Sequence, residues 1–170
     1  TNNFKTYEDL YPELNKEFEL WKDERVRLND FIVGQSYGTH DILIPAKIYD
    51  TRVGGILPIG EDPNFEAIVI KVTLNGGKYE NEWLEKNKQL KYYFKSISNN
   101  FKDSFKENRA ILENHLIPIY AFVREDKEHP FIFEGIFQYE SDHKNLEDGT
   151  KWFVLNNRNS ESLIKSEYLQ

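Results

Sequence analysis

Aromatic and cationic side chains alternate through one stretch of the sequence, from Asn81 to Arg109. It holds six rings and seven cations, namely Trp83, Tyr92, Tyr93, Phe94, Phe101 and Phe105 with Lys86, Lys88, Lys91, Lys95, Lys102, Lys106 and Arg109. Between Glu85 and Arg109 only three acids stand against them: Glu85, Asp103 and Glu107. Cations attract phosphates, and aromatic rings stack on bases. The stretch therefore predicts a surface that contacts nucleic acid.

The rest of the chain is acidic, with a net charge of −7 over 170 residues and a pI near 5.2. Nucleic-acid-binding proteins usually carry a basic footprint, so the overall charge argues against such a partner. Surface fields are screened beyond about 8–10 Å at physiological salt, however, so one basic segment can act locally. The alternative interpretation is that the rings are core residues and the lysines a solvated face. The acidity of the remainder favours the binding surface.

Length and composition indicate one globular domain with its own core. The sequence has no Cys, which excludes disulfides, thiolate metal sites and cysteine nucleophiles. No apolar run reaches the ~18 residues that a transmembrane helix needs, so we expect no membrane and a cytoplasmic location. The abrupt ends of the chain lead us to expect a fragment of a longer protein.

Hydrophobic periodicity divides the chain into three parts. Residues 1–30 are expected to form a helical segment, mainly Tyr7–Asp30, residues 31–157 a barrel, and residues 158–170 the start of a helix or linker. Within the barrel we expect a loop at Phe31–Asp41 and a loop or short helix at Asn81–Gln89. A helix is expected at Asp103–His115, capped by Asp103 or Ser104. Strands are expected in 65–74, 90–96, 117–125, 131–142 and 151–157. Gly135 is expected to permit a bend or bulge. Hairpin-like spacing predicts an α+β fold with a curved, mostly antiparallel, barrel-like sheet and flanking helices.

Motifs for catalysis and cofactor binding are absent from the sequence. No GxGxxG follows a strand, no Gly-Lys-Ser/Thr occurs, and the four histidines show no metal-ligand spacing. Glu66 and Lys71 lie on one predicted strand, but their spacing does not fit a PD-(D/E)xK nuclease centre. We therefore predict no catalytic residue, no metal and no cofactor. Among the histidines, only His40 is a candidate for a ligand contact, because it lies in a glycine-bracketed loop.

Several short motifs occur in an order that resembles a known family. They are the loop Gly34-Gln35-Ser36-Tyr37-Gly38, the Tyr-rich strand LKYYFKS, Asp103 ahead of Asn108-Arg109-Ala110-Ile111, and the strands IPIYAFVRE and FIFEGIFQY. Together they resemble the SRA-like (YDG-type) domains of modification-dependent restriction endonucleases, which belong to the PUA-like barrels. The resemblance covers about Phe31 to Asn157.

This resemblance implies a domain that takes one modified base, 5-methylcytosine or a derivative, out of double-stranded DNA. Extrusion costs a few kcal/mol, which stacking and hydrogen bonds to the Watson–Crick edge offset. The residues implied for the base pocket are Gln35, Tyr37, His40, Asp41, Trp83, Tyr92 and Tyr93, and those for phosphates are Lys91, Lys95, Lys102, Arg109 and Arg124. The domain would not cleave DNA itself and would direct a nuclease domain in the same chain.

Three other functions stay open at the level of sequence. An RNA reader of the EVE or YTH type uses similar aromatic cages on single strands. A protein-interaction domain of a defence or phage protein would need no nucleic acid. A nuclease with an unorthodox centre would cleave DNA in the presence of magnesium.

Overall fold

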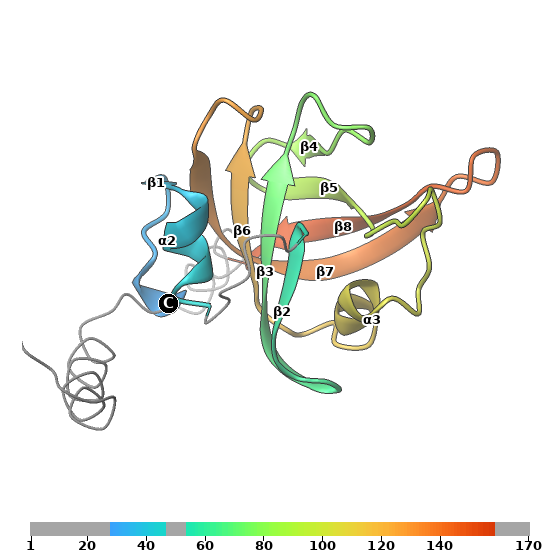
Figure 1. The fold of residues 1–170 in the computed structure, drawn as a ribbon, viewed down its shortest axis with the longest axis horizontal. Coiled ribbons are helices and arrows are strands. Elements are labelled where there is room, and N and C mark those ends of the chain that lie inside the picture. Colours follow the sequence, from blue (N-terminus) through green and yellow to red (C-terminus); the bar gives the residue numbers. More distant parts are fainter. Residues whose placement is uncertain (1–27, 47–53, 159–170) are drawn as a thin grey trace, which may run out of the picture.

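The computed structural model describes residues 28–46 and 54–158, which form a mixed sheet of eight strands with two short α-helices (Figure 1). Apart from a 3-10 turn, η1, at Leu28–Asp30, the helices predicted at Tyr7–Asp30 and after residue 158 lie outside the described residues. The boundaries proposed at residues 30 and 158 therefore stay predictions. No helix in the described ranges is long and apolar enough to cross a bilayer.

The strands form a curved sheet that does not close on itself. They are β1 Ser36–Tyr37, β2 Ile56–Glu61, β3 Asn64–Thr73, β4 Glu82–Glu85, β5 Gln89–Tyr93, β6 Ile119–Arg124, β7 Phe131–Lys144 and β8 Lys151–Asn157; the helices are α2 Thr39–Leu43 and α3 Lys106–Leu112. Their order is β2-β3-β6-β7-β8-β5-β4, with β1 paired to β7. Every pairing is antiparallel except β3 with β6. The predicted curved, mostly antiparallel sheet is confirmed, and the parallel β3–β6 pair is its one departure.

Apolar side chains pack on both faces of the central strands. Ile68, Ile70 and Val72 of β3 join one core cluster, to which α3 contributes Ala110 and Ile111. Ala67 and Val69 point the other way, into a second cluster with Ile42 and Leu43 of α2. Because successive side chains of a strand alternate between faces, β3 is apolar throughout its middle. The two helices therefore cover opposite faces of the sheet.

Proline and glycine occur where the sheet tolerates them. Pro58 lies in β2, the strand at one end of the sheet path, where a missing N–H costs least. Gly135 in β7 has φ 113°, and the register shifts there, since Ala121 pairs with Gly135 but Phe122 with Phe133. The bulge predicted at Gly135 is therefore confirmed.

Three local expectations were wrong. Asn81–Gln89 contains the strand β4, which pairs with β5 while Trp83 packs near Phe137 at 6.1 Å between ring centroids. The loop expected at Phe31–Asp41 contains β1 and the start of α2. Helix α3 begins after Phe105, without a cap from Asp103.

The late start of α3 has a physical reason. The Asp103 carboxylate accepts a hydrogen bond from the Lys151 ammonium at 2.7 Å, so it is engaged with β8 instead of the helix. Phe101 is buried ahead of the helix, whereas Phe105 is half-buried at its first boundary. Phe101 and Phe105 therefore do not share a helical face, although they are four residues apart.

Candidate nucleic-acid interface

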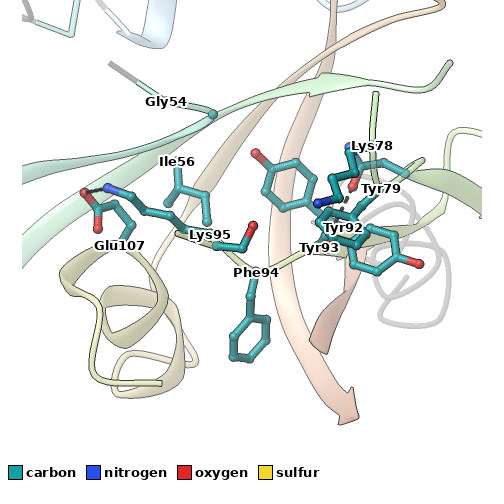
Figure 2. A pocket seen from close by; sticks show the side chains of 12 residues that line it. Gly54, Ile56, Lys78, Tyr79, Tyr92, Tyr93, Phe94, Lys95 and Glu107 are labelled. Atoms are coloured by element: carbon teal, nitrogen blue, oxygen red, sulfur yellow. Dashed lines mark hydrogen bonds and ion pairs between the residues drawn. The ribbon is translucent and has the colours of Figure 1, made fainter. Parts of the chain in front are cut away.

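An open cavity of about 400 Å³ lies where β5 passes the start of β2 and the first turn of α3 (Figure 2). Its lining consists of rings, cations and small residues: Gly54, Gly55, Ile56, Lys78, Tyr79, Asn81, Tyr92, Tyr93, Phe94, Lys95, Ser96 and Glu107. Small-molecule sites in proteins usually have volumes of about 300–1,000 Å³. The cavity is therefore large enough for a group such as a nucleobase.

Three tyrosines form the aromatic wall of this cavity. The ring centroids of Tyr79 and Tyr93 are 5.5 Å apart, with 39° between the ring planes. A base sandwiched between two rings needs them ~7 Å apart, since each stacked contact takes about 3.5 Å. A base can therefore stack on either ring but fits between them only after one has moved. Tyr92 is buried, its hydroxyl donates to the Lys71 carbonyl at 3.2 Å, and burial raises its pKa.

Asn81 holds the aromatic wall together through its side-chain amide. Its Oδ1 accepts the backbone N–H of Tyr93 at 2.9 Å, and its Nδ2 donates to the Thr73 carbonyl at 3.1 Å. These bonds connect the segment before β4 to both β5 and the end of β3. Asn81 is therefore a positioning residue for Tyr93.

A tight turn after β5 holds two of the residues that line the cavity, Lys78 and Tyr79. Ile97 and Asn100 exchange backbone hydrogen bonds at 3.1 and 3.0 Å around Ser98 and Asn99, whose φ angles are 49° and 64°. The Asn99 Oδ1 accepts hydrogen bonds from the Tyr79 hydroxyl, at 2.8 Å, and from the Lys78 ammonium. The turn thereby fixes the Tyr79 ring in its present orientation.

The other end of the cavity carries an ion pair. The Lys95 ammonium lies 2.8 Å from the Glu107 carboxylate, at the first turn of α3 (Figure 2). Desolvation raises the pKa of Glu107, but hydrogen bonds from Lys95 and the backbone outweigh it and lower the pKa overall. The cavity thus presents rings at one end and a polar, ionised pair at the other. No three His, Asp or Glu side chains within the described ranges gather to hold a metal ion.

No family model matches the sequence, and no curated protein matches it. Solved structures match its fold. The SRA domain of SUVH5 in complex with methylated CHH DNA matches with a TM-score of 0.57 and 16% identity, over 75% of this chain and 88% of that one. The DNA modification-dependent restriction endonuclease AspBHI matches with a TM-score of 0.54 and 18% identity, over 75% of each chain.

The chain has the SRA fold. A further structure, the SUVH5 SRA domain bound to fully hydroxymethylated CG DNA, matches with a TM-score of 0.53 and 16% identity, over 75% of this chain and 89% of that one. At these identities the likeness concerns the fold. The SRA-like fold expected from the ordered motifs is thereby confirmed.

Within this SRA fold, the predicted base-pocket residues separate into two groups. Tyr92 and Tyr93 line the cavity. Gln35, Tyr37, His40 and Asp41 lie around β1 and α2, where β1 pairs with the start of β7, and they do not line it. Tyr37 packs edge-on against Phe31 at 4.9 Å between ring centroids, in the second core cluster.

Polar groups in the β1–α2 segment have local partners. The Asp41 carboxylate accepts the Gly38 N–H at 3.0 Å, and the Tyr37 hydroxyl accepts the Ile32 N–H at 2.9 Å. Gln35 and His40 are exposed. Trp83, on β4, packs against the first core cluster and also lies outside the cavity lining.

The predicted phosphate-binding cations are spread over the SRA fold. Lys95 lines the cavity, and Lys91 lies over the Tyr93 and Trp152 rings at 5.1 and 4.4 Å. Lys102 is exposed, and Arg109 forms an ion pair with Asp62. Arg124 is on β6, at a second hollow.

The sequence reasoning missed Lys78, Tyr79 and Asn81. They follow the Asn75-Gly76-Gly77 turn, and the aromatic–basic stretch of the sequence begins only at Asn81, two residues after Tyr79. A Lys-Tyr pair directly after a glycine turn was the available signal, because such a turn brings the next residues back beside the strand it ends.

Proposed function

We propose that this chain is a DNA-reading module that recognises a modified cytosine by accepting the extruded base into the cavity beside Tyr93. The observation that carries the proposal is the open cavity in which Tyr79 and Tyr93 lie opposite the Lys95–Glu107 pair. Rings supply the stacking that offsets extrusion, and polar groups supply hydrogen bonds to the edge of the base. Similarity to SRA structures described as complexes with methylated and hydroxymethylated DNA supports the same partner.

In this proposal the base inserts between Tyr79 and Tyr93, which requires the Tyr79 ring to move, because the two ring centroids are only 5.5 Å apart. Its movement breaks the hydrogen bond between the Tyr79 hydroxyl and Asn99. The Tyr93 backbone stays fixed, since Asn81 accepts its N–H. In this proposal Tyr93 is the fixed plate and Tyr79 the movable one.

The module itself cleaves no DNA in this proposal and directs a nuclease domain of the same protein. Similarity to AspBHI, described as a DNA modification-dependent restriction endonuclease, supports that connection. A magnesium-dependent cleavage assay on methylated duplex tests it. Cleavage by the isolated chain would contradict it.

The base-reading proposal is tested by fluorescence anisotropy with duplexes that carry cytosine, 5-methylcytosine or 5-hydroxymethylcytosine, and with a modified RNA as competitor. We expect wild-type protein to prefer modified DNA over both unmodified duplex and RNA. Tyr93→Ala should remove about 1–3 kcal/mol of binding free energy, the usual contribution of one base stacked on a ring. That loss should fall on the modified duplex, where the base is extruded.

Tyr37→Ala is the matched control, because Tyr37 is a half-buried ring outside the cavity. It should keep the preference for modified DNA. Thermal melting of both variants establishes that each is folded. Equal binding of all duplexes by wild-type protein, or loss of preference in Tyr37→Ala but not in Tyr93→Ala, would overturn the proposal.

A further inference from the structure

A second hollow, of about 300 Å³, adjoins the base cavity. The two share Gly54, Gly55, Tyr79 and Asn81 in their linings. The second hollow adds residues of different chemistry, two cations with a hydroxyl, a glycine and a ring: Lys71, Thr73, Arg124, Gly77 and Phe131. A group attached to a nucleotide in the first cavity can therefore reach the second.

The strands place the two cations together. Lys71 and Thr73 are two residues apart on β3, and Thr73 pairs with Arg124 in the parallel β3–β6 register. The Arg124 Nε donates to the Thr73 hydroxyl at 2.9 Å, and its guanidinium lies 4.4 Å from the centroid of the Phe131 ring. Arg124 is thus held in place before any ligand arrives.

Neither cation has a carboxylate partner among the described residues, in contrast to other cations of this protein. Lys95 is paired with Glu107 and Arg109 with Asp62, whereas no ion pair involves Lys71 or Arg124 within those residues. Lys71 is half-buried. Desolvation is the main cause that lowers the pKa of Lys71, and the charge of Arg124 is the second. Two neighbouring cations in a partly desolvated hollow repel each other, so an anion between them would be stabilised by both.

We propose that this hollow binds one phosphodiester of the DNA, the phosphate adjoining the nucleotide in the base cavity. The inference rests on the proposed function and adds Lys71 and Thr73 to it. The Arg124 fork and the Lys71 ammonium supply charge-assisted donors for phosphate oxygens. Gly54 and Gly77 leave the backbone accessible to a close anion, because they have no side chains.

The test is the salt dependence of duplex binding by wild-type protein and Lys71→Gln, measured by fluorescence anisotropy on methylated and unmodified duplexes. Loss of one phosphate contact should flatten the slope of log K against log salt by about 0.9, which is about a fivefold loss of affinity at physiological salt. The loss should be larger on the methylated duplex, because there the extruded nucleotide brings its own phosphate to this hollow. Lys71→Arg should retain most of the affinity.

Lys144→Gln is the control, because Lys144 is an exposed lysine at the end of β7, outside both hollows. Its slope should match that of wild-type protein. Lys71→Met keeps the aliphatic stem and gives a second uncharged variant if Lys71→Gln does not fold. Inorganic phosphate is titrated separately into the free protein, with the Gly77 amide resonance as the readout.

The outcomes separate this inference from the base-reading proposal. An unchanged slope in Lys71→Gln, with Tyr93→Ala still abolishing preference for modified DNA, would overturn the phosphate site alone. A flattened slope without preference for modified DNA in wild-type protein would overturn base reading alone. Saturation by sub-millimolar inorganic phosphate with an unchanged duplex slope would assign the hollow to a free anion and overturn the DNA-phosphate assignment.

Discussion

Asn108 binds both backbone polar groups of Lys95. Its Oδ1 accepts the Lys95 N–H at 2.7 Å, and its Nδ2 donates to the Lys95 carbonyl at 3.0 Å. The same Nδ2 donates to the Lys102 carbonyl at 2.9 Å. Asn108 is fully buried on α3, so water cannot replace it. The helix therefore fixes the chain that carries the Lys95 ammonium at the cavity.

We expect Asn108→Ala to lower the free energy of unfolding by about 3 kcal/mol. The substitution leaves three partly buried backbone groups without their partner, and a single unsatisfied buried group costs about 1–3 kcal/mol. Urea denaturation measures the change. Asn114→Ala is the control, because the Asn114 side chain makes one hydrogen bond, to the Ala110 carbonyl at 2.9 Å. Equal destabilisation by the two substitutions would show that the Asn108 hydrogen bonds to the Lys95 and Lys102 backbone contribute no more stability than the single Asn114 bond.

The strand core of this protein is largely predictable from sequence, because its signals are local. Lys151–Asn157 was expected as a strand and forms β8 with those bounds. The continuous β-branched run in β3 and the aromatic alternation in β5 likewise identify strands. Gly135 marks the bulge of β7 for a similar reason, since its φ of 113° disfavours other residues.

The cavity could not be predicted, because long-range pairing creates it. Tyr79 and Tyr93 meet only because the Asn81 side chain connects β5 to the end of β3. No pattern in the sequence between residues 79 and 93 indicates those hydrogen bonds. The prediction of the α3 start was wrong for the same reason, because the Asp103 carboxylate binds Lys151 on β8. The Gly34–Asp41 segment carries strong turn residues, yet β1 places it on the second core cluster.

Gly55 permits the close approach of β2 to the cavity wall, and we expect Gly55→Ala to destabilise the protein by about 1–3 kcal/mol, a typical cost of overpacking. A Cβ atom at Gly55 would overlap the Tyr92 hydroxyl and lie 3.0 Å from the Lys71 carbonyl oxygen. Tyr92→Phe removes the first obstacle, so the double variant should recover part of the loss. A double-mutant cycle by urea denaturation measures this coupling.

Gly54→Ala is the control for that cycle. Gly54 adjoins Gly55, but a Cβ atom there would meet nothing within 4 Å. Its unfolding free energy should stay within about 0.5 kcal/mol of wild-type, as for most surface substitutions. Additive effects of Gly55→Ala and Tyr92→Phe would contradict the proposed steric contact.

Asp62 and Arg109 connect the β2–β3 turn to α3, and we expect this contact to contribute stability that depends on pH. Guanidinium nitrogens of Arg109 lie 3.0 and 2.5 Å from the two Asp62 carboxylate oxygens. Hydrogen bonding from Arg109 holds the pKa of Asp62 below its ordinary value of 3.8. The contribution is therefore present above about pH 4 and is lost as pH falls through the lower, folded-state pKa.

Asp62→Asn should reduce stability at neutral pH, and its difference from wild-type should shrink as the pH falls below 3.8. Urea denaturation at a series of pH values measures the difference. Glu147→Gln, at an exposed position in the β7–β8 turn, should show no such pH-dependent difference. A constant gap between Asp62→Asn and wild-type down to pH 2 would exclude an ionised Asp62 as the source of the contribution.

His129 closes the turn between β6 and β7 through Asp126, and we expect it to titrate above its ordinary pKa of 6.5. The His129 Nδ1 lies 2.7 Å from the Asp126 carboxylate, which also accepts the Glu128 N–H at 2.8 Å. Hydrogen bonding and charge attraction from Asp126 raise the pKa of His129. A raised folded-state pKa means that the pair stabilises the turn below pH 6.5 and loses that contribution as pH rises through the folded-state pKa.

NMR titration of the His129 ring protons should place its midpoint above 6.5, and Asp126→Asn should move it down. Asp142→Asn, on β7 beside Tyr139, is the control and should leave His129 unchanged. A His129 midpoint that is the same in wild-type and Asp126→Asn would mean that the two side chains do not interact in solution.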